Sequence, residues 1–113
     1  MGRSEARTAT VDFGENTAGQ ETGVLDAGET VSSCTIACTT KPSGAADPTM
    51  GSVSVNGSVV YVNGRSCSAG EAVSVLLTMA SDQTYGRYVF TLTATTSSSH
   101  VLKRLIRVDV GVD

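Results

Sequence analysis

The sequence has few of the residues that catalysis usually requires. Its 113 residues include no tryptophan and a single histidine, and aromatic residues make up only 4% of the chain. His100 follows the serines of 97–99. That arrangement is typical of a solvated turn, which is commonly built from small hydroxyl residues, rather than of a nucleophile beside its base. We therefore expect a protein that is not an enzyme and that binds no cofactor.

Long hydrophobic runs and an excess of positive charge are also missing. No run of 18 apolar residues occurs, and the N-terminal sequence lacks the apolar stretch of a secretory signal. Eight basic residues against 11 acidic residues leave a net charge of −3, which argues against a phosphate-binding surface. We expect neither a membrane nor a nucleic acid as partner, and we expect synthesis in the cytoplasm.

Cysteine is scarce and odd in number. Cys34 and Cys38 lie about 13 Å apart along a strand, too far for a disulfide, so we expect them and Cys67 to be free thiols that pack like small apolar side chains. His100 is far along the chain from Cys67 and does not complete a zinc site. The acidic residues near the N-terminus lack the dense spacing of a calcium loop, so no metal site is expected. These acids are Asp12, Glu15, Glu21, Asp26 and Glu29.

The residues that are abundant favour β-structure. Valine and threonine each occur 15 times and serine 14 times, a mixture that suits half-buried strands and turns. Alternation of apolar and polar side chains predicts one-sided strands, and Asn56-Gly57 between valine-rich runs predicts a β-hairpin. The expected elements are strands at 9–13, 30–39, 72–79, 87–95 and 101–110 and a hairpin over 52–62. About seven short strands without a helix predict an all-β protein, an immunoglobulin-like antiparallel β-sandwich.

The domain organisation expected from the sequence is simple. Residues 1–10 are polar and without periodicity, which predicts a flexible N-terminal arm, and residues 11–113 form a single sandwich domain. Residues 41–51 contain both prolines, which is typical of a crossover between two sheets rather than of a hairpin. At the start of the strand expected at 87–95, Gly86 and Tyr88 resemble the corner that opens one strand of immunoglobulin-like domains, where the tyrosine hydroxyl bonds to upstream backbone.

Four segments carry a family resemblance that spans most of residues 20–110. They are 23–31 (GVLDAGETV), 73–77 (VSVLL), 86–97 (GRYVFTLTATTS) and 104–110 (RLIRVDV). Together they resemble a family of small virion proteins of tailed bacteriophages, the fibre-tail adaptors. The resemblance implies a non-enzymatic structural protein of the virion, oligomeric in the particle, whose partners are tail, fibre or capsid subunits.

Such an adaptor would work by docking. The arm at 1–10 and the loops at 14–23 and 41–51 would become ordered against neighbouring subunits, and basic side chains would meet acids of those neighbours. The basic side chains expected at these contacts are Arg3, Arg7, Lys103, Arg104 and Arg107. Arg104 interrupts the inward face of the last strand, and its stem is expected to extend to an edge.

Two other functions remain open at this point. A related sandwich could decorate the capsid as a cement protein or lie at the head-tail junction. In a different class, a bacterial immunoglobulin-like module could bind a ligand or a carbohydrate, with Tyr61 and Tyr85 as the stacking surfaces.

Overall fold

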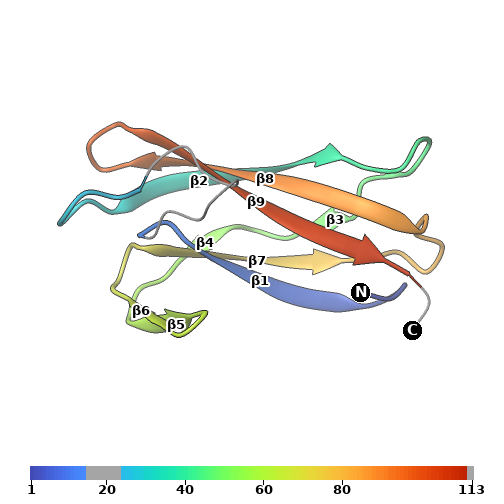
Figure 1. Cartoon of the computed structure of the whole chain (residues 1–113), viewed down its shortest axis with the longest axis horizontal. Coiled ribbons are helices and arrows are strands. Elements are labelled where there is room, and N and C mark those ends of the chain that lie inside the picture. The colour runs from blue at the N-terminus through green and yellow to red at the C-terminus, as the bar shows by residue number, and fades with distance from the viewer. Residues whose placement is uncertain (15–23, 112–113) are drawn as a thin grey trace.

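The structure is a computed structural model that describes residues 1–14 and 24–111, and these residues form two packed β-sheets (Figure 1). One sheet has the order β1-β7-β3, with β4 also paired to β7, and the other has the order β2-β8-β9. A small hairpin, β5-β6, lies at one end. The strands are β1 Ala6–Asp12, β2 Val31–Thr40, β3 Thr49–Met50, β4 Ser54–Val55, β5 Val60–Val62, β6 Arg65–Cys67, β7 Ala72–Thr78, β8 Gly86–Thr96 and β9 Val101–Val110. The prediction of an all-β sandwich is confirmed, with nine strands in the described part of the chain where about seven were expected.

The core lies between the two sheets and follows the predicted alternation. Four alternate residues of β8 are completely buried, and they face the buried residues of β7. The four are Tyr88, Phe90, Leu92 and Ala94. The core has two parts along the long axis, one around Phe13 and Leu92 and one around Tyr88 and Phe90, and Ile36 and Ile106 pack against both. The described residues include no helix that is long and apolar enough to span a membrane.

The N-terminal arm is not free as expected. Residues Ala6–Asp12 pair with β7 along their whole length, with Ala9 opposite Val75. The residues before them are also attached, because the backbone N–H of Ser4 donates to the carbonyl of Ala80. The strand expected at 9–13 therefore begins earlier, at Ala6; its first part looks polar because Thr8 and Thr10 face solvent on the outer side of the sheet. Residues 6–10 therefore belong to the sandwich.

The predicted hairpin over 52–62 is also wrong. β4 pairs with β7, and β5 pairs with β6 through a turn at Asn63-Gly64. Both turn residues have positive φ, 51° and 82°, as a type I′ turn requires. The chain contains two Asn-Gly pairs, and the side chain of Asn56 is used differently, to hold the loop that leads to the hairpin. The expected crossover at 41–51 does connect the two sheets, since it leads from β2 to β3.

Candidate functional site

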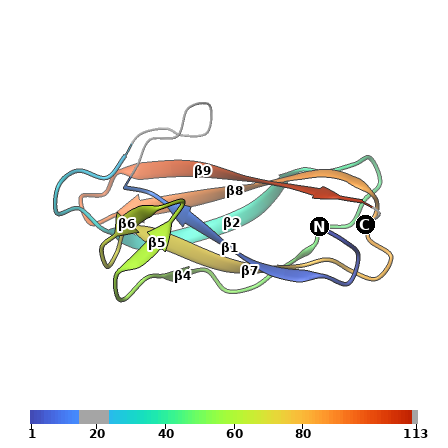
Figure 2. The same cartoon turned by 60° about the horizontal axis from the view of Figure 1, so that its bottom comes forward.

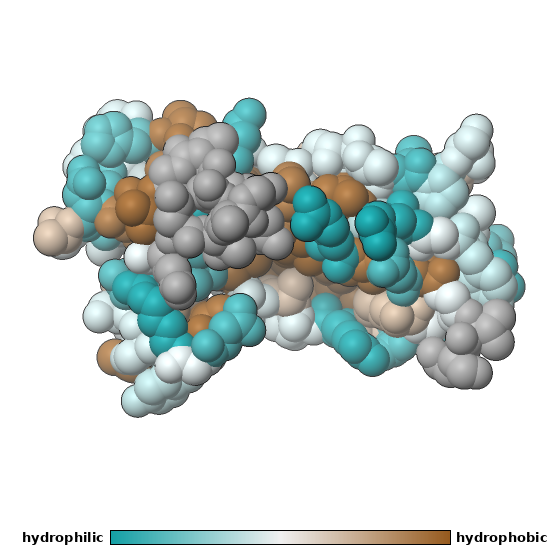
Figure 3. All heavy atoms as spheres, viewed as in Figure 1, coloured by the Kyte–Doolittle hydropathy of each residue, from teal (hydrophilic) through white to brown (hydrophobic). Residues whose placement is uncertain are grey.

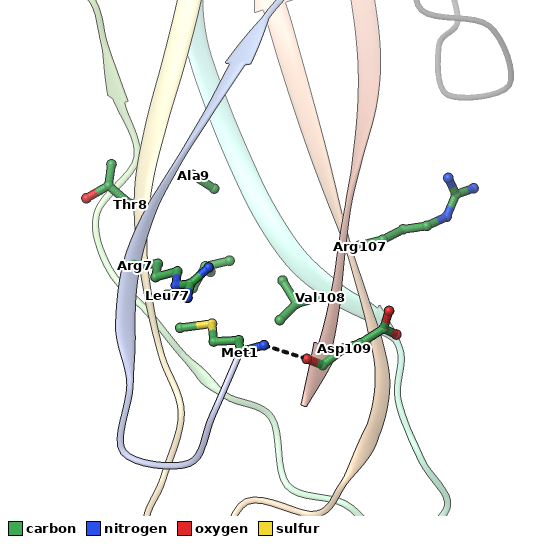
Figure 4. Close-up of a pocket in the computed structure, with 8 residues that line it drawn as sticks. All are labelled: Met1, Arg7, Thr8, Ala9, Leu77, Arg107, Val108 and Asp109. Atoms are coloured by element: carbon green, nitrogen blue, oxygen red, sulfur yellow. Dashed lines mark hydrogen bonds between the residues drawn. The ribbon is translucent and has the colours of Figure 1, made fainter. Parts of the chain in front are cut away.

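One flank of the sandwich is open between β1 and β9, which are the edge strands of the two sheets. A groove of about 240 Å³ lies there. Ala9, Leu77 and Val108 point into it (Figure 4). Figure 3 shows apolar side chains along the same line between the sheets, with hydrophilic side chains on both sides. The flank therefore exposes part of the core at the boundary of two sheet edges.

The structure brings two of the expected basic contact residues to this flank. Lys103 and Arg107 are exposed on the outer face of β9, and Arg107 also borders the groove. In Figure 4 the Arg107 side chain points away from the groove, toward the outer side of the sheet. The two cations therefore stand beside an open sheet edge.

Arg104 does not belong with them, and its prediction as a subunit contact is wrong. Its exposed fraction is 1%, and its guanidinium carbon lies 5.0 Å from the centre of the Phe13 ring. Its Nη1 donates to the carbonyl of Lys103 at 2.8 Å. Arg104 is opposite Leu92, on the inward face of β9, so its long side chain covers the end of the core. A buried guanidinium of this kind cannot contact a neighbouring subunit.

Arg3 and Arg7 are exposed but have partners within the chain. The Nε of Arg3 donates to the carbonyl of Gln83 at 2.7 Å, and its guanidinium lies 4.0 Å above the ring of Tyr85. Arg7 donates to Glu5 at 2.5 Å. The backbone N–H of Gly2 and the Arg7 side chain together lower the pKa of the Glu5 carboxyl. Both arginines fix the N-terminal segment, and Arg7 also borders the groove.

At the end of the sandwich away from the two termini, the β5-β6 hairpin projects beyond β7 and β1 (Figure 1), and it lies in front of them in Figure 2. Val59 is 57% exposed and Tyr61 is 76% exposed. The hairpin is attached to β1, because Nη1 of Arg65 donates to both carboxylate oxygens of Asp12 at 2.8 Å. That hydrogen bond raises the pKa of Arg65 further above its usual value. The hairpin thus presents an apolar surface from a fixed position.

Asn56 holds the other side of the same hairpin. Its Nδ2 donates to the carbonyls of Ser58 and Ser68 at 2.9 Å, and its Oδ1 accepts from the N–H groups of Gly70 and Ala72. One side chain therefore ties both connections of the hairpin to the start of β7. An Asn-Gly pair indicates a turn but not the contacts of the asparagine side chain, so the sequence does not predict this role of Asn56.

The corner residues occupy the end of the sandwich away from the hairpin. Tyr88 is fully buried, and its hydroxyl donates to the carbonyl of Thr84 at 2.6 Å, which is the upstream bond expected of such a corner. The hydroxyl also accepts from Nε2 of the buried Gln83 at 3.0 Å. Gly86 has a φ of 138°, and a Cβ on it would lie 2.7 Å from Cγ of Pro42. Both residues have structural roles.

Asp26, Glu29 and His100 form a cluster that sequence analysis did not bring together. One ligand atom from each lies within 4.8 Å of the others. Glu29 is buried, and its carboxylate accepts from the Thr96 hydroxyl and from the N–H of Asp26 at 2.8 Å, while Nδ1 of His100 lies 2.9 Å from it. These hydrogen bonds lower the pKa of Glu29, the Thr96 bond most of all. The Glu29 carboxylate already accepts hydrogen bonds from groups of the protein. The cluster therefore joins the chain before β2 to the β8-β9 turn.

Nothing in the described structure gives His100 a nucleophile. Among residues 1–14 and 24–111, no serine hydroxyl is hydrogen-bonded to its ring, and the hydroxyl of Ser97 accepts from the N–H of Thr30. Glu15 and Glu21, two of the acids weighed as calcium ligands, lie outside the described residues, as does most of the loop at 14–23. The prediction of a non-enzymatic protein stays a prediction.

The three cysteines are not reactive thiols. All three are free thiols, and burial raises the pKa of Cys34 to about 11. Burial also raises the pKa of Cys67, which is completely enclosed under the hairpin. At neutral pH these thiols stay protonated and unreactive.

The two tyrosines considered for carbohydrate binding do not form one surface. Tyr61 lies on the hairpin beside the start of β7, and Tyr85 lies in the connection after the end of β7, under the guanidinium of Arg3. A stacking platform built from both is therefore not present. No protein-family model, curated protein or solved structure matches this chain, so the immunoglobulin-like part of the fold prediction stays a prediction.

Proposed function

We propose that the protein is a structural component of a bacteriophage virion, an adaptor that joins tail and fibre or other neighbouring subunits without catalysing a reaction. The resemblance of four segments to fibre-tail adaptors suggests the class. The observation that carries the proposal is the β5-β6 hairpin, an apolar contact element fixed to a rigid body.

Three features of the hairpin suit a docking role. Its exposed Val59 and Tyr61 offer an aromatic and an aliphatic side chain close together, the kind of pair that forms the centre of protein interfaces. The Arg65 to Asp12 bond and the Asn56 bonds hold it in place before any partner arrives. A contact element that is already ordered loses less conformational entropy on binding than a mobile loop.

The test is to ask whether the chain is a part of virions and whether Tyr61 holds it there. We expect the chain in purified particles of the phage that encodes it, located by cryo-electron microscopy between tail and fibre. Its position also separates an adaptor from a capsid decoration or head-tail junction protein.

Particles of a phage carrying Tyr61→Ala should contain at least about tenfold less of the protein or of its neighbour than wild-type particles. The reason is that the substitution removes a central interface side chain. Tyr61→Phe is the matched control, since it keeps the ring and should assemble normally. Purified particles that lack the chain altogether would contradict the proposal.

A further inference from the structure

The open edge of β9 is a second place where a partner can bind. Within residues 1–14 and 24–111, β9 pairs with β8 on one side, and its other side is contacted by backbone only at its end. There the Met1 nitrogen donates to the carbonyl of Asp109 at 2.8 Å (Figure 4). The N–H of Gly111 donates to the carbonyl of Met1 at 3.2 Å. Met1 thus already occupies a position beside the strand.

The two hydrogen bonds of Met1 have the pattern of a strand that runs parallel to β9. A residue that donates to one residue of a strand and accepts from the residue two places further along makes the bonds of a parallel pair, whereas antiparallel partners exchange both bonds with one residue. Met1 therefore continues β9's sheet as a parallel strand would. Because backbone groups alternate sides along a strand, the N–H and C=O of Arg107 and Leu105 point to the same open edge as those of Asp109.

The space beside this edge can accept alternating side chains. An added strand that ends before Met1 would place every second side chain over Ala9 and Val108, in the groove that Met1 and the buried Leu77 also line. The intervening side chains would lie on the outer face, beside Arg107 and Lys103. The carboxylate of Asp109, also on this face, is engaged by Arg87 at 3.0 Å.

Charge decides between a second copy and another partner. If two copies paired their β9 edges antiparallel about Leu105, Lys103 of one would lie opposite Arg107 of the other, and like charges directly opposite one another destabilise a sheet. Basic side chains on an edge strand also suppress indiscriminate pairing. A strand with acidic residues on its outer face would instead place opposite charges beside these basic side chains, which stabilises the pairing.

We propose that the flank between β1 and β9 binds an extended segment of another protein as an added strand, parallel to β9, with apolar residues facing the groove and acidic residues facing outward. This inference deepens the proposed function, since it names the kind of segment that a virion neighbour would supply. It can be tested without the particle, so its failure is distinguishable from absence of the chain in virions.

The experiment titrates the full-length, isotope-labelled chain with a capped synthetic hexapeptide of alternating valine and glutamate, followed by NMR. We expect shifts of the amide signals at Leu105, Arg107 and Ala9, and slower hydrogen exchange at Leu105 and Arg107. A peptide of alternating valine and lysine should bind about tenfold more weakly. A valine–glutamate peptide that is N-methylated at the amides facing β9 should also bind about tenfold more weakly, because it cannot complete the ladder.

Arg107→Glu tests the charge on the protein itself. This exposed substitution should leave the fold intact and reverse the preference between the glutamate and lysine peptides. Lys41→Glu, just after β2 on the opposite edge of the sheet, is the control; it removes the ion pair with Asp47 and should change neither affinity. The proposal is overturned by no binding, by equal binding of the three peptides, or by protection of Leu105 and Arg107 through dimerisation without peptide.

Discussion

At the scale of single residues, Glu29 shows how position outweighs composition. In the sequence it is one of several scattered acids that suggest a solvated surface. In the structure it is buried, and it accepts hydrogen bonds from Thr96 and from the backbone of Asp26, with His100 beside it. Thr96 and His100 come from the β8-β9 turn, which is distant in sequence, so no local pattern could have indicated their contacts with Glu29.

Glu29→Gln should reduce stability in a pH-dependent way. The folded-state pKa of Glu29 is lowered, so its ionised form stabilises the fold above its usual pKa of about 4.5, and this contribution is lost as the pH falls through the lowered value. In urea unfolding, the variant should be less stable than the wild type at about pH 7, and the difference should shrink as the pH falls below about 4.5. Asp82→Asn, in the exposed β7-β8 turn, is the control. A difference that persists unchanged at low pH would show that the charge of Glu29 is not its contribution.

At the scale of elements, the β5-β6 hairpin depends on a side chain outside it. Its own strands have three residues each, too few for an isolated hairpin to be stable in water. Val62 and Cys67 supply a small apolar contact with Ala72, and Asn56 supplies the polar contacts with the chain at both of its ends. The docking surface proposed above is therefore only as rigid as these attachments.

Asn56→Ala should release the hairpin. The substitution leaves the N–H groups of Gly70 and Ala72 without their side-chain acceptor, and we expect a loss of about 2 to 3 kcal/mol in the free energy of unfolding. Hydrogen exchange at Val62 and Cys67 should accelerate more than exchange in β8. Asn63→Asp is the matched control, because aspartate also tolerates the positive φ of the turn, and it should change stability by no more than about 0.5 kcal/mol. Equal effects of the two variants would contradict the role of Asn56.

At the scale of the whole molecule, the sequence predicted what depends on local alternation. The inward residues of β7, β8 and β9 follow period two, so the two-layer core could be predicted from them. The pairing of β1 with β7 joins residues such as Ala9 and Val75, far apart in the chain, and a polar outer face hid it. Arg104 was misplaced for the same reason, because the ring that covers it, Phe13, comes from the other end of the sequence. The open flank between β1 and β9 is a product of such long-range pairing, whereas the β5-β6 hairpin is local and has a sequence signal in Asn63-Gly64.

The molecule is 43 Å long, and we expect its two ends to unfold in a single cooperative transition. Asn56 is bonded to the start of β7 and Tyr88 lies beyond its end, about 20 Å away at the rise of a strand. Tyr88→Phe removes a buried hydroxyl that donates to the carbonyl of Thr84 and accepts from Gln83. It should lower the free energy of unfolding by about 1 to 2 kcal/mol. Because the sites share no partner, the cost of Tyr88→Phe combined with Asn56→Ala should equal the sum of the single costs within about 0.5 kcal/mol.

The same double variant tests cooperativity, because Ile36 and Ile106 contact both parts of the core and should transmit the loss of either end to the whole. Tyrosine fluorescence and far-ultraviolet circular dichroism should follow one urea transition with one midpoint. Two separated transitions would mean that the shared isoleucines do not couple the parts. The hairpin end could then open while the open flank stays folded, and an adaptor built this way would bind its two neighbours independently.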